Sequence, residues 1–168
     1  MDGAAKVPNM ASLLAAQKLI VMALLDDDSQ GRSIRDEMLK SRLLRDEQVI
    51  LVSEAFDSAK PSEADIEDLL DPSVFEVLVR DSYSKELQGK TLTLNTNIPR
   101  IVKRFEEAFK QEGLTFHKTR TAGLFYRRMT MNPTSLMIGD STKRFDRLFA
   151  TIKARLETTI ARGNDPFH

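Results

Sequence analysis

Residues 19–31 read LIVMALLDDDSQG, and this stretch decides the fold. Seven apolar residues run without a break and end at three aspartates, residues 26–28. A short apolar run that ends in a turn is typical of a strand buried on both faces of a parallel sheet. A buried helix segment is the alternative, but the run is too short for a full helix. The stretch therefore predicts a strand over residues 19–25.

A helix and a second strand are expected next. Gly31 allows the chain to turn sharply into a helix over about residues 32–44. The sequence QVILVS at 48–53 then has the character of another short, apolar strand. Strand, helix and strand at this spacing form a βαβ unit, which implies a right-handed crossover and a parallel sheet. The predicted fold class is α/β, with a partial, Rossmann-like parallel sheet followed by a helical part.

Two of the aspartates are candidate metal ligands. Asp26 and Asp28 alternate in an extended chain, so both carboxylates are expected to point the same way beyond the end of the strand. Mg²⁺ and Mn²⁺ prefer such oxygen ligands, usually one or two carboxylates with water and substrate phosphates. The alternative is structural: Asp28 or Ser29 caps the next helix and the other acids are solvated.

A second acidic cluster lies at residues 57–72. Ser62 followed by Asp65 matches a helix-start pattern, and Asp71 before Pro72 resembles the start of another helix. Glu67 and Asp68 are not needed for capping in this interpretation. Asp65 and Glu67 are therefore candidates for a second metal site, because two-metal sites need more carboxylates than one pair supplies.

The chain beyond residue 73 is expected to be mostly helical. Helices are predicted over about 73–87, from Asn97 to before Gly113, and over 142–161. The expected domain organisation is an α/β core over 1–72, a helical extension over 73–162 that packs on it, and a tail over 163–168. The inward-facing residues predicted from helical spacing are Val74, Phe75, Leu78, Val79, Ile101, Val102, Phe105, Ala108, Phe109, Phe145, Leu148, Phe149, Ile152, Leu156 and Ile160.

Basic side chains gather in the second half of the chain. Residues 116–128 read FHKTRTAGLFYRR, in which bases alternate with aromatic side chains. That mixture suits contact with a nucleic-acid backbone and stacking on bases. The alternative is that the aromatics belong to the core and the charges form a solvated face. The candidate nucleic-acid-binding residues are Arg100, Lys103, Arg104 and Arg120.

Composition narrows the possible chemistry. The 168 residues include no cysteine and only two histidines, so thiolate sites are excluded and any metal is expected to be held by carboxylates. The formal net charge is zero, but acids predominate in residues 1–72 and bases in residues 96–131. The chain has no apolar run long enough to span a bilayer and no signal peptide, so we expect a cytoplasmic protein without a membrane partner.

Four segments together resemble a known family. LLDDDSQGRSIRDEML, VILVSEAF, EADIEDLL and FHKTRTAGLF are similar, in order and spacing, to the Toprim domain of ATP-dependent nucleases of the OLD (overcoming lysogenization defect) family. The similarity covers roughly residues 1–150. It implies metal-dependent cleavage of DNA with two Mg²⁺ or Mn²⁺ ions. Asp26 and Asp28 match the first metal-binding pair and Asp65 and Glu67 the later pair, while Lys118 matches the base that stabilises charge on the scissile phosphate.

The chain also departs from the family pattern. A Toprim domain begins with a strand that bears a glutamate, and no such strand precedes the DxD stretch here. No GxxxxGK[ST] motif is present, so the ATPase is expected to be supplied elsewhere, as another domain or subunit. The expected function is the C-terminal part of a nuclease that is incomplete alone, with an open sheet edge that favours homo-oligomers. The alternatives are a non-catalytic interaction or dimerisation module and, last, a receiver-like signalling domain.

Overall fold

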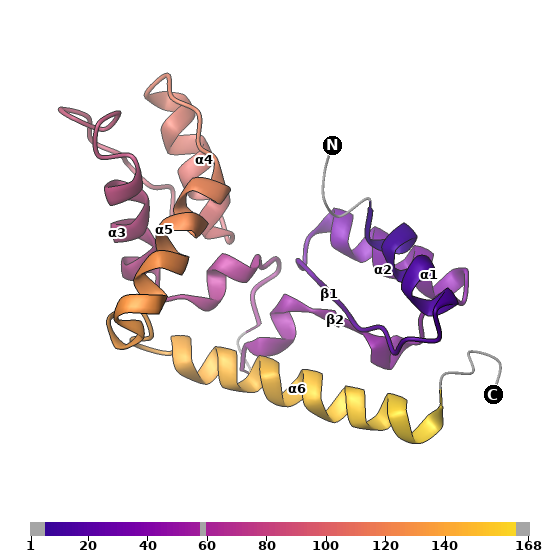
Figure 1. Cartoon of the computed structure of the whole chain (residues 1–168). Coiled ribbons are helices and arrows are strands. Elements are labelled where there is room, and N and C mark those ends of the chain that lie inside the picture. Colours follow the sequence, from indigo (N-terminus) through magenta and orange to yellow (C-terminus); the bar gives the residue numbers. More distant parts are fainter. Residues whose placement is uncertain (1–5, 58–59, 164–168) are drawn as a thin grey trace. The chain divides into compact units, whose positions relative to one another are not determined.

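The computed structural model describes residues 6–57 and 60–163 (Figure 1). The chain forms two compact units. Unit 1 comprises the residues up to Ala64 together with those from Asp146 onward, and unit 2 comprises Asp65–Phe145. The expected division lay at residue 72; in the structure the C-terminal helix α6 (Ser141–Arg162) begins in unit 2 and ends in unit 1. The expected tail lies, from residue 164 on, outside the described residues.

Unit 1 contains a small parallel sheet. Strand β1 (Ala23–Leu25) pairs with β2 (Val49–Leu51) in parallel, with Leu24 opposite Ile50. Helix α2 (Ser29–Lys40) connects the two strands. This arrangement confirms the predicted βαβ unit and a mixed α/β fold, although each strand has only three residues and the strand expected over 19–25 is regular only in its last part.

Helices cover the strands of unit 1. Helix α1 (Val7–Ala16) and α2 pack their apolar side chains against Ala23, Leu25 and Val49. Residues of α6 approach the same strands through polar contacts: Arg155 donates to the carbonyl of Val49 at 2.8 Å. The core of unit 1 is therefore built around the βαβ unit, and it fixes the C-terminal end of β1, where the three aspartates follow.

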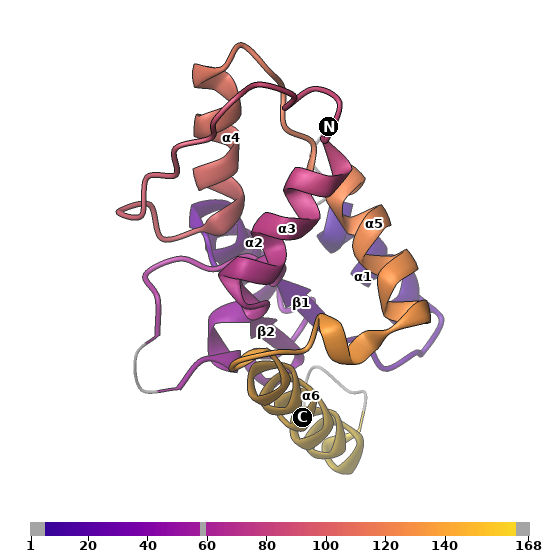
Figure 2. The same ribbon diagram turned by 90° about the vertical axis from the view of Figure 1, so that its left-hand side faces the viewer.

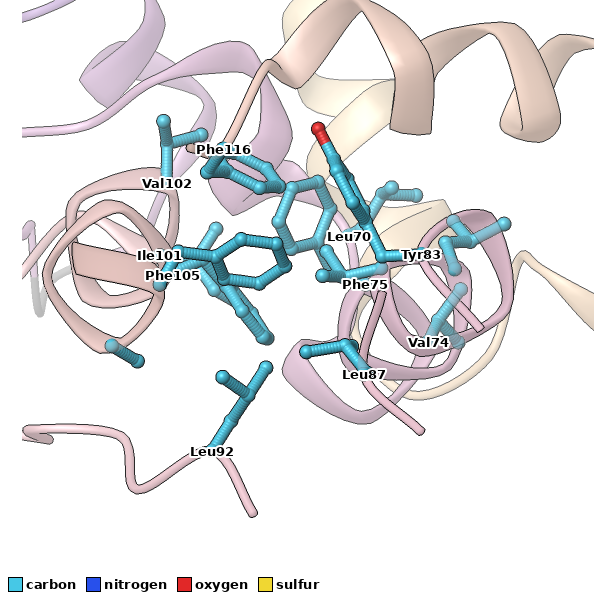
Figure 3. Packing of buried hydrophobic residues seen from close by; sticks show 14 of the residues in the cluster. Leu70, Val74, Phe75, Tyr83, Leu87, Leu92, Ile101, Val102, Phe105 and Phe116 are labelled. Atoms are coloured by element: carbon cyan, nitrogen blue, oxygen red, sulfur yellow. The ribbon is translucent and has the colours of Figure 1, made fainter. Parts of the chain in front are cut away.

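Unit 2 is helical and has an aromatic core. Its elements are the short 3-10 helix η4 (Ile66–Leu69) and helices α3 (Pro72–Ser82), α4 (Ile101–Gln111) and α5 (Lys118–Met131). Helix α3 contacts both α4, through Phe75 and Phe105, and α5, through Ser82 and Thr121 (Figure 2). Tyr83 and Phe116 complete the cluster that Figure 3 shows from close by. Every inward-facing residue predicted for α3 and α4 is buried.

Two predicted helix ends in unit 2 were wrong. Helix α3 ends at Ser82, because turns replace the helix before Gly89, which has a φ of 76°. Helix α4 begins at Ile101 and not after Asn97, because its first N–H is capped by the distant Asp68. The predicted start of α3 is confirmed: the Asp71 side chain accepts from the Ser73 N–H at 2.9 Å, and Pro72 is the first helical residue.

Helix α6 is the longest helix, with 22 residues. Leu148 is buried as predicted, but Phe149 and Ile160 are more than half exposed and do not face a core within the described residues. Across the described parts of the chain, no helix is both long and apolar enough to cross a membrane.

Candidate functional site

The three consecutive aspartates follow β1 directly, and the structure gives them different surroundings. Asp27 is buried, forms an ion pair with Arg32 at 2.6 Å and bridges to the backbone of Ala64. Asp26 and Asp28 on either side of it are half-buried. The carboxylate of Asp27 therefore binds Arg32 of α2, and the two predicted metal ligands, Asp26 and Asp28, flank it after the end of β1.

Asp28 also has a structural role. Its Oδ1 accepts from the Gly31 N–H at 2.7 Å and caps α2, as the structural alternative anticipated. The helix begins at Ser29, before Gly31, so the prediction that Gly31 makes the turn was wrong. A Cβ at Gly31 would lie 1.9 Å from the Asp26 carbonyl oxygen. Glycine is needed there because the start of the helix lies directly against the end of the strand.

Asp65 is enclosed in unit 2 and forms an ion pair there. It has no exposed surface, and its Oδ1 accepts from Arg100 Nη2 at 2.5 Å. Its other oxygen, Oδ2, is buried without a hydrogen-bond partner among the described residues. A predicted metal ligand, Asp65, and a predicted nucleic-acid-binding residue, Arg100, thus bind each other.

Asp68 joins two helix starts. Its Oδ2 accepts from the Asp65 N–H at 2.8 Å, at the start of η4, and its Oδ1 accepts from the Ile101 N–H at 2.7 Å, at the start of α4. The prediction that Asp68 is not needed for capping was therefore wrong. Burial raises the pKa of Asp68, and the two backbone N–H groups oppose that shift. Its partner at Ile101 is far away in sequence, so no local pattern indicated it.

Glu67 and Lys118 lie side by side. Lys118 is the first residue of α5, and its Nζ is 3.8 Å from Glu67 Oε1. Glu67 also lines a cavity of about 170 Å³, together with apolar residues and the buried Thr121. The structure thus brings together, within unit 2, the predicted metal ligand Glu67 and Lys118, which is predicted to stabilise charge on the phosphate.

The remaining candidate nucleic-acid-binding residues all have acceptors within unit 2. Lys103 pairs with Glu106 at 2.6 Å, and Arg104 donates to the carbonyl of Ile98 at 2.6 Å. Arg120 makes two hydrogen bonds to Glu86, at 2.5 and 3.1 Å, with its guanidinium over the Tyr83 ring. The Arg120 guanidinium lowers the pKa of Glu86. A phosphate backbone must compete with these acceptors, which weakens the electrostatic attraction available to it.

The candidate metal ligands lie as one pair in each unit. Asp26 and Asp28 follow β1 in unit 1. In unit 2, Asp65 directly precedes η4 and Glu67 lies on it. Within the described ranges, no group of three or more acidic or histidine side chains gathers closely enough to hold a metal ion. Carboxylate oxygens are the ligands that Mg²⁺ and Mn²⁺ prefer, with water or substrate phosphates completing the coordination.

Known proteins do not identify the chain. Comparisons with models of protein families, with curated proteins and with solved structures found no match. The sequence analysis assigned no role to Asp27 and wrongly excluded Asp68 from capping, although both residues are structurally decisive. The signal for Asp27 was its place between two alternating carboxylates, which puts it on the opposite side of an extended chain.

Proposed function

We propose that this chain is the Toprim-like part of a divalent-metal-dependent DNA endonuclease of the OLD type. Its reaction is hydrolysis of a phosphodiester with two Mg²⁺ or Mn²⁺ ions, and its partners are DNA and an ATPase domain or subunit supplied elsewhere. The ions supply a nucleophilic hydroxide at neutral pH and neutralise charge on the phosphate. The residues of this chain hold the ions, position the phosphate and stabilise the charge that develops on it.

The observation that carries this proposal is the division of roles at the end of β1. Asp27 is buried and paired with Arg32, whereas Asp26 and Asp28 are only half-buried, at the end of a parallel strand, where α/β sheets bind ligands. Asp26 and Asp28 are the proposed ligands of the first metal.

Unit 2 supplies the other proposed roles. The buried Asp65 Oδ2, which lacks a hydrogen-bond partner among the described residues, and the neighbouring Glu67 are the proposed ligands of the second metal. Lys118, held at 3.8 Å from Glu67, is the proposed group that stabilises charge on the scissile phosphate. Arg100, Lys103, Arg104 and Arg120 are the proposed contacts to the DNA backbone, each after exchanging an internal acceptor for a phosphate.

Calorimetric titration with Mn²⁺ tests the first metal site. We expect wild-type protein to bind Mn²⁺ and Asp26→Asn to lose at least ten-fold in affinity, because the amide removes the charge but keeps the volume. Asp36→Asn is the matched control, since Asp36 is an exposed acid on α2 in the same unit. Equal Mn²⁺ affinity in wild type and Asp26→Asn would refute the site. Nicking of a supercoiled plasmid by the same samples then shows whether the chain cleaves DNA alone.

A non-catalytic interaction module is the second candidate function. It is favoured by the internal pairing of the candidate DNA-binding cations, which leaves them stabilising unit 2. In that case Mn²⁺ does not bind measurably, and binding of a DNA duplex is weak and depends little on salt. A steep fall in DNA affinity with salt would instead indicate that these cations release their internal partners and contact phosphates.

A further inference from the structure

One side of helix α5 in unit 2 is open to solvent, although it carries two large apolar side chains. This side, called the α5 face below, consists of residues at helical spacing, namely Gly123, Tyr126, Arg127, Thr130 and Met131. Tyr126 is 71% exposed and Met131 is 83% exposed, the two largest values among the large apolar side chains of the described residues. Large apolar side chains that gather on an exposed surface mark a binding site.

The charge of α5 favours an anionic ligand. The helix carries four bases and no acid. Three of the bases are paired with acids of unit 2, in the ion pairs Lys118–Glu67, Arg120–Glu86 and Arg128–Asp81. Arg127 is the exception, because its guanidinium makes no hydrogen bond or ion pair within the described part of the chain. It can therefore bind a phosphate without giving up an internal acceptor.

Gly123 leaves space beside these two side chains. A glycine inside a helix is destabilising relative to alanine, and packing gives no reason for it here. A Cβ at this position would meet Arg127 Nη1 at 3.7 Å and no other heavy atom within 4 Å. The guanidinium of Arg127 thus lies back along the helix near Gly123, and Tyr126 is one turn further on. The missing side chain allows a ligand to approach the helix backbone closely.

We propose that the α5 face binds a single-stranded segment of DNA, an inference that rests on the proposed function and names the form of its substrate. The ring of Tyr126 stacks on a base, Arg127 binds a phosphate, and the DNA backbone passes over Gly123. A single strand is favoured because the bases of a duplex are already stacked on one another, so an exposed ring has no base face to contact. An acidic peptide would use Arg127 but would leave the neighbouring ring without a partner.

Fluorescence anisotropy with a labelled oligothymidylate of about 20 nucleotides tests the stacking contact. The titration is done in EDTA, so that it does not depend on the metal sites. Wild-type protein is expected to bind this probe more tightly than a duplex of the same length. Tyr126→Ala is expected to weaken binding by about five-fold or more, whereas Tyr126→Phe keeps the ring. Equal affinity for the duplex, or unchanged affinity in Tyr126→Ala, would overturn the proposal.

The salt dependence of the same titration tests the phosphate contact. Arg127→Gln removes one cation, so the slope of log affinity against log salt concentration is expected to become shallower by about 0.7. Lys110→Gln is the matched control, because Lys110 is an exposed base on α4 in the same unit, and its slope should equal that of wild type. Equal slopes for Arg127→Gln and Lys110→Gln would overturn the contact, and so would binding of a polyglutamate peptide as tight as that of the oligothymidylate.

Gly123→Leu separates binding from folding. Leucine is a better helix former than glycine, so this variant is expected to melt no lower than wild type. Its side chain fills the space beside Arg127, and its affinity for oligothymidylate is expected to fall. Affinity equal to that of wild type would overturn the role of Gly123.

The two proposals fail separately. If wild-type protein binds Mn²⁺ through Asp26 but does not bind oligothymidylate in EDTA, the α5 face is overturned and the metal site stands. If it binds oligothymidylate through Tyr126 but does not bind Mn²⁺, the α5 face is supported and the metal site is refuted.

Discussion

Replacing Asp68 tests the idea that one carboxylate organises unit 2. Its two oxygens cap the starts of η4 and α4, at 2.8 Å from the Asp65 nitrogen and 2.7 Å from the Ile101 nitrogen. Asp68→Ala removes both acceptors and leaves two backbone N–H groups without them. Asp68→Asn keeps the volume and one oxygen, but turns an NH₂ group towards the other N–H, so one cap is lost.

The expected magnitude follows from the number of caps. Each helix cap is worth about 1 kcal/mol, so Asp68→Ala is expected to lower the free energy of unfolding by about 2 kcal/mol and Asp68→Asn by about 1 kcal/mol. The raised pKa of Asp68 shows that burial disfavours its ionised form, which keeps these values from being larger. Asp81→Ala is the control, because its ion pair with Arg128 is half-exposed and is worth about 0–1 kcal/mol.

Urea unfolding followed by tyrosine fluorescence measures this effect within unit 2. The chain has no tryptophan, and its two tyrosines, Tyr83 and Tyr126, both lie in unit 2. Tyr83 is buried and hydrogen-bonded to the backbone of His117, so its emission is expected to change on unfolding. If Asp68→Ala unfolds within about 0.5 kcal/mol of wild type, the double cap does not stabilise the unit and the reasoning is refuted.

The remaining predictions concern glycines and pH. Gly31→Ala is expected to destabilise by about 1–3 kcal/mol, because the new methyl group overlaps the Asp26 carbonyl; Gly123→Ala, with only a side-chain atom at 3.7 Å, should instead stabilise by about 0.5–1 kcal/mol. Thermal melts that rank the two variants alike would contradict the close approach. The Ser73 hydroxyl lowers the pKa of Asp71, so its contribution is present above the ordinary carboxyl pKa of about 4 and is lost as pH falls through its folded pKa. Asp68 has the opposite sign: its pKa is raised, so its contribution is present below about pH 4 and is lost as pH rises through its folded pKa. The free energy of unfolding of Asp71→Asn and Asp68→Asn is to be measured in urea from pH 3 to 7. Its difference from wild type should change with pH in opposite directions for the two variants, and changes in the same direction would contradict the two pKa assignments.

Local pattern predicted the βαβ unit, α3, α4 and α6, and the inward faces of α3 and α4, but it did not predict α5, and Phe149 and Ile160 of α6 are exposed. The apolar run before Asp26 and the apolar helix pattern after it predicted the βαβ unit, because burial of a strand or a helix face is written in the spacing of its own residues. The start of α3 was predicted for the same reason, since Asp71 and Pro72 act on backbone groups within one turn. The predicted start of α4 was wrong, because its first N–H is capped by Asp68, a residue far away in the sequence.

Tertiary structure decided what the charged residues do. Asp68 caps α4 across 33 positions, and Asp65 meets Arg100 across 35, so neither partner can be inferred from neighbours in the sequence. Gly31 proved necessary because of a contact with the strand end, which no turn rule describes. The sequence by itself determined which apolar faces of α3 and α4 are buried, since periodicity is local. Only the folded chain decided which acid pairs with which base, because those pairs depend on segments brought together from far apart.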